Sequence, residues 1–506
     1  MPIQNLRLSP CRDTGPRRRA LLSSLLPLLL LLLPCFSAPA HAFDFDDVAQ
    51  RARLLAQKPY QKREEKLPTT LQNLGAQKYR DIRMKGERVL WRGAKLPFEV
   101  ELLSPGDMFA TPVKIHEISS QGVREFKYDP ELFDYPEPGA DTRALAQAKL
   151  GFSGLRIRAA GGNNGSKGGA EDLLQFQGAS YMRGQVRGNS RGLAHGSFAR
   201  GLALDTALNS GEKFPQFVEF WLERPSPGDR DLGVMALLDS PDATGAYRFV
   251  VRPGSDAVVE VKAQLYLRKA PEKLGIAPLT GMFFFGENQP HPPDDYRPEV
   301  HGADGLSIQG GDGEWIWRPL SNPKRLLVTA FALDNPLGFG LLQRDRQFSN
   351  YEDLGMRYEQ RPNVWVEPLG KWGTGHVELV QIPSPSEWND NIVAFWTPDE
   401  LQGQPRLKGR PLLFEYRLSW SREARRPPTA WVTQTRWGHG YRARPDTNVG
   451  LIVDFEGPAL KGLDANSPVD VVASCDGNGK ILSSRAYYNE ASGGWRVELQ
   501  VLRYDP

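Results

Sequence analysis

Glycine and proline recur along the whole chain, and they constrain its fold more than any other feature. Fifty glycines and 41 prolines divide the 506 residues into many short runs, which is typical of strands joined by turns. In the clearest run, 259–267, an apolar residue stands at every second position and Glu, Lys, Gln and Tyr stand between them. Such a strand has one apolar face and one face exposed to solvent. The runs 98–102 and 414–420 repeat the pattern.

Helical patterns are scarce by comparison. Asp44 can cap a helix that carries Val48, Ala52 and Leu55 on one face,. A second helix is expected from about Thr69 to Ile82, after a proline. Because strands and helices do not alternate, the sequence favours an all-β fold built as a sandwich or a pair of sandwiches. A segment rich in proline and glycine at 397–411 marks the expected domain boundary,.

The first 42 residues have the form of an export signal. An arginine run at 17–19 precedes an apolar stretch from Ala20 to Leu33, which is too short to span a bilayer well,. The stretch is followed by Ala40-His41-Ala42, the small-residue pattern that signal peptidase cleaves,. We therefore expect the mature chain to begin at Phe43, in the periplasm and without stable membrane insertion.

Charge and cysteine content narrow the possible partners. The signal holds five arginines and one aspartate out of 63 basic and 60 acidic residues, so the remaining chain is close to neutral. A nucleic-acid partner or an anionic membrane would require a basic surplus. Only Cys475 lies outside the signal, so the mature chain cannot form an internal disulfide,.

The common catalytic motifs are missing from the sequence. The histidines show no paired spacing that would predict a zinc site, and no Gly-x-Ser-x-Gly elbow is present,. The sequence predicts neither a metal nor a cofactor. Twelve tryptophans and fifteen tyrosines, several of them beside charged residues in turns, could line a saccharide cleft, but aromatic residues of β-proteins are more often core or cross-strand pairs,.

A series of blocks between Phe43 and Trp396 identifies a family resemblance. In order they read GASY at 178–181, ARGLA at 199–203, ALLDS at 236–240, TGAY at 244–247, LGIAPLT at 274–280, GEWIWRPL at 313–320, NPLGFGLLQ at 335–343 and NDNIVAFW at 389–396. With these blocks the chain resembles the periplasmic glucan biosynthesis proteins G and D (OpgG/MdoG and OpgD), and it is most similar to the G branch.

The resemblance implies an architecture of two sandwiches. A large β-sandwich of the galactose mutarotase-like kind would occupy 43–398, followed by a linker at 399–410. A smaller immunoglobulin-like β-sandwich would occupy 411–506. Since the chain ends where family members continue for a few strands, this second sandwich is expected to lack its last strands or to be capped differently.

The resemblance also implies a function. Family members act in the biosynthesis of osmoregulated periplasmic glucans, whose backbone is β-1,2-linked glucose, downstream of an inner-membrane glucosyltransferase. Some are similar to inverting glucanases. Two hypotheses follow: a glycoside hydrolase or transglycosylase acting on β-1,2-glucan, or a non-catalytic carbohydrate-binding partner of the membrane glucan synthase.

Two carboxylates are the candidate catalytic pair. The family's general acid falls on Asp390, which could otherwise open an Asx turn before a strand. The family's base position falls on Gly302, which offers no proton acceptor. Asp304 is the expected substitute, if an extended backbone points it to the same face as residue 302. The alternative for Asp304 is a turn residue before Gly305.

The resemblance also selects candidate substrate-binding residues. For Trp315 and Trp317, packing in the core is an equally good explanation. For Arg346, Tyr351 and Asp353 in the stretch 343–353, an ordinary salt bridge within a loop is an equally good explanation. We expect several of these residues to lie with Asp390 along one cleft. The candidates are Tyr181, Trp315, Trp317, Arg346, Tyr351, Asp353 and Trp372.

Overall fold

A computed structural model describes residues 42–63, 66–136, 142–148, 150–160, 169–188, 192–401, 410–438 and 448–504. The chain divides into two units, Met1–Ala42 and Phe43–Pro506, and the description below concerns the second. The expected signal lies outside the described residues apart from Ala42.

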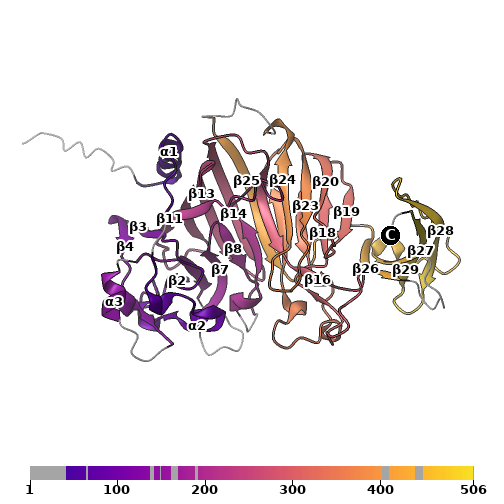
Figure 1. Ribbon diagram of the computed structural model, residues 1–506, viewed down its shortest axis with the longest axis horizontal. Helices are drawn as coiled ribbons and strands as arrows, with labels where there is room; N and C mark the ends of the chain where they lie inside the picture. Colours follow the sequence, from indigo (N-terminus) through magenta and orange to yellow (C-terminus); the bar gives the residue numbers. More distant parts are fainter. Residues whose placement is uncertain are drawn as a thin grey trace, which may run out of the picture. The chain divides into compact units, whose positions relative to one another are not determined.

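Two large sheets dominate the fold (Figure 1). The ten-stranded sheet has the order β2 (Phe98–Leu103), β6 (Gly154–Ala159), β7 (Glu171–Gln177), β8 (Tyr181–Gly184), β9 (Ser197–Arg200), β15 (Leu274–Gly281), β24 (Ile392–Pro398), β23 (Thr374–Gln381), β20 (Leu327–Asp334), with β10 (Leu202–Leu204) also paired to β15. The eleven-stranded sheet has the order β19 (Trp315–Pro319), β18 (Gly305–Gln309), β21 (Gly338–Leu342), β22 (Asn363–Pro368), β25 (Leu412–Ser421), β14 (Ala257–Leu267), β13 (Ala243–Pro253), β12 (Leu232–Asp239), β11 (Gln216–Glu223), β3 (Lys114–Ser119), β4 (Gly122–Phe126).

Smaller elements complete the fold. The two-stranded sheets pair β1 (Arg83–Met84) with β5 (Phe133–Asp134) and β16 (Phe283–Phe285) with β17 (Val300–His301). The described α-helices are α1 (Phe45–Ala56), α2 (Gly75–Asp81) and α3 (Thr142–Gln147). Single 3-10 turns lie at Thr69–Leu71, Gly86–Arg88, Pro130–Leu132, Gly192–His195, Phe348–Asn350, Tyr358–Gln360, Asp399–Leu401 and Pro458–Leu460. None of the described helices is long and apolar enough to cross a membrane.

The inner faces of the two large sheets form one hydrophobic core. Phe176 of β7 packs against Phe249 of β13, with ring centroids 5.0 Å apart. The indole of Trp420 in β25 donates to the carbonyl of Ser197 in β9 at 2.9 Å. Gly184 allows this approach, because a Cβ there would lie 2.2 Å from the Trp420 ring,. The predicted all-β sandwich is confirmed, and the runs 98–102, 259–267 and 414–420 are strands β2, β14 and β25.

The first of the two predicted helices is confirmed, and the second is not continuous. Helix α1 begins after Asp44, whose side chain accepts from the backbone of Asp46 and Asp47, and it buries Val48 and Ala52 against β11 to β13. The second helix is divided into a 3-10 turn at Thr69–Leu71 and the short α2. Asn73 between them and Gly75 at the start of α2 have φ values of 52° and 72°, which a continuous right-handed helix cannot contain,.

The structure corrects the predicted start of the C-terminal domain. Strand β25 follows the expected linker, of which 402–409 lie outside the described residues, and it pairs with β14 and β22 inside the eleven-stranded sheet. Its alternating pattern suits a strand of the large sandwich as well as one of a separate domain. The following strands β26 (Trp431–Gly438), β27 (Asn448–Glu456), β29 (Gly494–Arg503) and β28 (Gly479–Asn489) form one antiparallel sheet in this order. The described residues after β25 show no second sheet of the kind that an immunoglobulin-like sandwich contains.

Candidate functional site

A cavity of about 640 Å³ lies on the outer face of the ten-stranded sheet. Val100 and Leu102 of β2 point into the core, so Glu101 between them points outward into the cavity,. Strands β6, β7, β8 and β9 extend this floor, and α2 with the segment 103–109 lies across it. The lining residues include Tyr79, Arg80, Met108, Phe109, Glu101, Arg156, Asp172, Gln175, Gln177, Tyr181, Arg183, Phe198 and Asp390.

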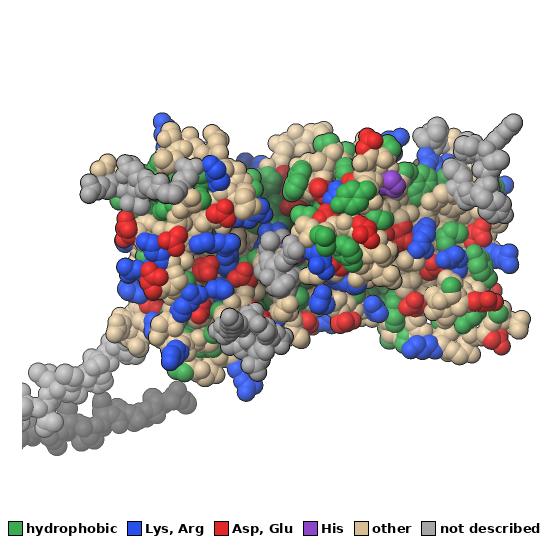
Figure 2. All heavy atoms as spheres, turned by 90° about the horizontal axis from the view of Figure 1, so that it is seen from below, with side chains coloured by type: hydrophobic (Ala, Val, Ile, Leu, Met, Phe, Trp, Pro, Cys, Tyr) green, Lys and Arg blue, Asp and Glu red, His purple; other side chains and the backbone are tan. Residues whose placement is uncertain are grey.

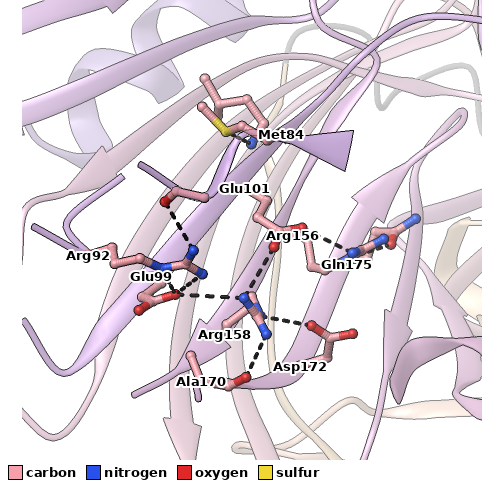
Figure 3. Close-up of polar contacts among 11 residues, drawn as sticks. Met84, Arg92, Glu99, Glu101, Arg156, Arg158, Ala170, Asp172 and Gln175 are labelled. Carbon is pink, nitrogen blue, oxygen red and sulfur yellow. Dashed lines mark hydrogen bonds and ion pairs between the residues drawn. The ribbon is translucent and has the colours of Figure 1, made fainter. Parts of the chain in front are cut away.

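The floor of the cavity is a row of polar side chains in register on adjacent strands. Glu101 stands opposite Arg156, Arg156 opposite Gln175, and Gln175 opposite Arg183. Arg156 donates to Glu101 at 3.0 Å and to Gln175 at 3.2 Å, as Figure 3 shows. The guanidinium of Arg183 lies 4.5 Å from the ring centroid of Phe198. The row offers hydrogen-bonding groups for a polyhydroxylated ligand.

A second group of charges fixes one side of this floor (Figure 3). Arg158 donates to Glu101 at 3.2 Å and to Asp172 at 3.1 Å. Arg92 donates to Glu99 at 2.6 Å. Because the charges are paired with one another, this group beside the cavity carries little net charge. Figure 2 shows acidic and basic side chains similarly mixed over one face of the molecule.

Tyr79 attaches the covering helix α2 to the floor. Its hydroxyl donates to the carbonyl of Ser104 at 2.8 Å and accepts from the amide of Gln177 at 2.6 Å. Its ring lies 5.2 Å from that of Phe109. Burial raises the pKa of Tyr79 to about 12, so the phenol stays neutral. The cavity therefore has an aromatic wall above its polar floor.

Asp390 lies where the large cavity meets a small one of about 20 Å³, which Gly302 and Arg361 also line. Its side chain is open to solvent, although protein surrounds the site. Desolvation by this surrounding protein raises the pKa of Asp390, and the positive charges of Arg361, Arg183 and Arg200 oppose the rise. A carboxyl group that stays protonated above its ordinary range can act as a general acid.

The residue after Asp390 fixes its position. Asn391 is buried and accepts from the backbone N–H of Phe283 at 2.9 Å. Its amide donates to the carbonyls of Phe283 and Ile382 at 2.9 and 3.1 Å. The backbone at Asp390 is therefore held to two neighbouring segments immediately before β24.

Tyr181 is the predicted binding residue that lines the same large cavity as Asp390. Its ring meets that of Phe198 edge-on at 5.9 Å, and the guanidinium of Arg200 lies 5.2 Å from the Tyr181 ring centroid. Burial raises the pKa of its hydroxyl. The structure thus brings together two of the nine predicted residues, Tyr181 and Asp390.

Asp304 lines a different small cavity, with Glu287, Glu299 and His301 among its neighbours. Its carboxylate accepts from the backbone N–H of Arg344 at 3.1 Å and of Asp345 at 3.4 Å. The side chain therefore supports the turn after β21. The two candidate catalytic carboxylates do not line a common cavity among those described.

The three predicted tryptophans pack against protein and do not line the large cavity. Trp315 stacks on Trp365 with ring centroids 5.9 Å apart. The guanidinium of Arg344 lies 3.3 Å from the Trp317 ring centroid. Trp372 is buried against Trp396, Phe414 and Tyr416, with centroids 5.9 to 6.2 Å away.

The predicted binding residues Arg346, Tyr351 and Asp353 stabilise the loop 343–353 and the segments next to it. Arg346 donates to the carbonyl of Glu359 at 3.0 Å and to the side chain of Asn363 at 3.2 Å. Tyr351 is fully buried, and its hydroxyl donates to the carbonyl of Asp345 at 3.3 Å. Asp353 accepts from the backbone N–H of Gly355 and Met356, and it pairs with Arg297 at 2.7 Å.

Three carboxylates have the spacing of cation ligands. Ligand atoms of Glu287, Glu299 and Asp345 lie within 4.8 Å of one another. Each already has a protein partner, since Arg436 lies 3.0 Å from Glu287, His301 lies 2.7 Å from Glu299, and Asn350 donates to Asp345. Burial, with the neighbouring acidic groups, raises the pKa of Glu287 to about 8.

Most of the cavity floor could not be predicted from the sequence. Arg156, Gln175 and Arg183 occupy the polar positions of alternating strands, which is also the pattern of an ordinary solvated face,. The alternation identifies such positions, but the strand order is needed to place them beside one another.

The fold and the cavity define a β-sandwich protein with a candidate ligand site that has a polar floor and an aromatic wall. Residues 43–506 match the family described as "Periplasmic glucan biosynthesis protein, MdoG". The chain belongs to this family.

Two known proteins can be compared with the chain directly. It is 52% identical over 482 residues to "Glucans biosynthesis protein G" of Ralstonia nicotianae, which covers 94% of this chain and 93% of the relative. The crystal structure of the Slr1438 protein from Synechocystis sp. PCC 6803 covers 67% of this chain and 95% of its own, at 10% identity and a TM-score of 0.16. A score this low supports no structural argument.

Proposed function

We propose that this protein acts in the periplasm on the β-1,2-linked glucose backbone of osmoregulated periplasmic glucans, as an inverting glucanase or a glucan transferase. Asp390 is the proposed general acid, which protonates the leaving glycosidic oxygen. The observation that carries the proposal is the position of this carboxyl group, with its raised pKa, at the wall of the large cavity with the polar floor.

The cavity supports a neutral sugar chain as the ligand. Its floor alternates carboxylate, guanidinium and amide groups that can bind hydroxyls, and Tyr79, Phe109 and Tyr181 add aromatic surface,. The direct test is incubation of the purified protein with linear β-1,2-glucan, followed by assay for new reducing ends or for new linkages in a closed glucan. A β-1,4-linked glucan of similar length is the control.

A second function is favoured by one specific observation. Asp390 is the only carboxylate among the described residues that line the small cavity shared with Gly302, and an inverting mechanism needs a second carboxylate about 6.5 to 9.5 Å away. The protein would then be a non-catalytic partner that presents the glucan to the membrane glucosyltransferase. Glucan binding without new reducing ends or linkages, together with copurification of the synthase, would support this alternative.

We predict that Gly302→Asp increases glucan hydrolysis by about tenfold or more, because a positioned base contributes about 10²- to 10⁴-fold to the rate. A Cβ at residue 302 would lie 3.2 Å from Cδ of Arg361, so the new carboxylate would enter the small cavity beside this flexible side chain. The rate of reducing-end formation measures the effect.

Asp304→Asn is the companion variant, and it tests whether Asp304 acts as a poor substitute base through a water relay. An asparagine oxygen can still accept from the N–H groups of Arg344 and Asp345, so folding should be kept while the proton acceptor is lost,. We expect the residual hydrolysis to fall. If Gly302→Asp hydrolyses no faster and Asp304→Asn loses nothing, neither position supplies a base, and the non-catalytic function becomes the better one.

We also predict that the protein is recovered by osmotic shock with Phe43 as its first residue, because Ala40-His41-Ala42 is a cleavage site for signal peptidase,. N-terminal sequencing of the recovered protein checks this. A chain that begins at Met1, or that stays with the membranes after a salt wash, would contradict it.

A further inference from the structure

Three large apolar side chains on separate loops are exposed outside the cavity. Tyr296 is 80% exposed, Leu354 67% and Trp388 77%. Each lies next in sequence to a member of a single ion-pair group, the Arg297 cluster, which consists of Arg297, Asp295, Asp353 and Glu387. We call the two exposed rings, together with the neighbouring Leu354 side chain, the aromatic patch.

The Arg297 cluster joins three segments of the chain. The guanidinium of Arg297 donates to Asp295 at 2.8 Å, to Asp353 at 2.7 Å and to Glu387 at 2.9 Å. Glu387 also accepts from the hydroxyl of Tyr358 at 2.7 Å. The charged side chains are only 13 to 17% exposed. A largely buried cluster therefore fixes the backbones that carry the patch.

The neighbouring charge limits what can bind to the patch. In the cluster three carboxylates surround one guanidinium, and the exposed Asp294 and Glu352 add further negative charge nearby. An anionic lipid surface or a phosphate group would be repelled. The rings of Tyr296 and Trp388 present open faces, which suit the C–H faces of a neutral sugar ring.

Trp388 also connects the patch with the proposed catalytic site. It precedes Asp390 by two residues, which limits the distance between their Cα atoms to about 7 Å. The backbone that carries the Trp388 ring therefore lies close to the backbone of Asp390, which lines the large cavity.

We infer that the aromatic patch is a second binding surface for a neutral glucan chain, outside the cavity and continuous with it at Trp388 and Asp390. This inference rests on the proposed function. The patch adds affinity for chains too long to be held by the cavity alone.

The test compares Trp388→Ala and Tyr296→Ala with the wild-type protein. The control is Tyr504→Ala, because Tyr504 is 59% exposed and belongs to neither the patch nor the cavity lining. The probes are a long linear β-1,2-glucan and a short β-1,2-linked oligosaccharide. We expect each patch variant to increase the Kd for the long glucan by about tenfold, as truncation of a well-placed aromatic side chain does. The Kd for the oligosaccharide should be unchanged, and Tyr504→Ala should match the wild type.

The outcomes separate this inference from the proposed function. If the wild-type protein binds neither probe, the proposed function fails, and the inference with it. If the wild-type protein binds both and the patch variants keep full affinity for the long glucan, only the inference fails. Loss of an oligomer in Trp388→Ala with unchanged glucan binding would show that the patch is a protein interface, which also overturns the inference.

Discussion

Replacing Asp390 with asparagine is expected to lower turnover of β-1,2-glucan by about 10²- to 10⁴-fold, because an amide cannot transfer a proton to the glycosidic oxygen. Glucan binding should remain nearly intact, since the amide keeps the shape of the acid and Asn391 still holds the backbone. Turnover and Kd measured on the same preparation check both parts. Asp172→Asn is the matched control, because Asp172 lines the same cavity but pairs with Arg158.

The pH dependence of the wild-type protein provides an independent readout. A general acid works only while it is protonated, so activity should fall as the pH rises through the pKa of Asp390. Desolvation raises this pKa above that of an ordinary aspartic acid, which is about 3.9,. Arg361 opposes the rise, so Arg361→Met should move the alkaline limb to still higher pH. Wild-type turnover in Asp390→Asn would mean that Asp390 only opens the turn before β24.

The fold could be predicted where the pattern is local. Alternation at 98–102, 259–267 and 414–420 identified strands, and the cap at Asp44 identified α1. The domain boundary could not be read in this way. Proline and glycine mark a change of direction whether the chain leaves a domain or crosses within one, and β25 returns to the large sheet after such a segment.

The candidate site was predicted only where a family motif pointed to single residues. Asp390 and Tyr181 line one cavity. The rest of the floor depends on the pairing of β2 with β6, of β6 with β7 and of β7 with β8, which brings Glu101 and Arg183 to one surface from distant parts of the chain. Trp372 was predicted to bind substrate but is buried in the core. An aromatic residue in a turn-rich stretch can pack in a core as well as line a ligand site, and the sequence pattern does not distinguish the two.

The Arg297 cluster leads to the largest expected change in stability. Arg297→Met should lower the free energy of unfolding by about 3 to 5 kcal/mol, because it leaves three largely buried carboxylates close together without their cation,. Denaturant unfolding of the intact protein measures the loss. Arg252→Met is the matched control, since Arg252 also pairs with two carboxylates but is 44% exposed, and we expect it to cost about 0 to 1 kcal/mol,.

The same variant should also reduce glucan turnover if catalysis occurs, because Glu387 ties the loop that ends at Asp390 to Arg297. Arg297→Lys keeps the charge but loses the forked geometry that reaches three carboxylates, so its stability should fall between those of the wild type and Arg297→Met. An unfolding free energy for Arg297→Met equal to that of Arg252→Met would show that the three loops are held by other contacts. The aromatic patch would then lack the rigid base that its proposed role requires.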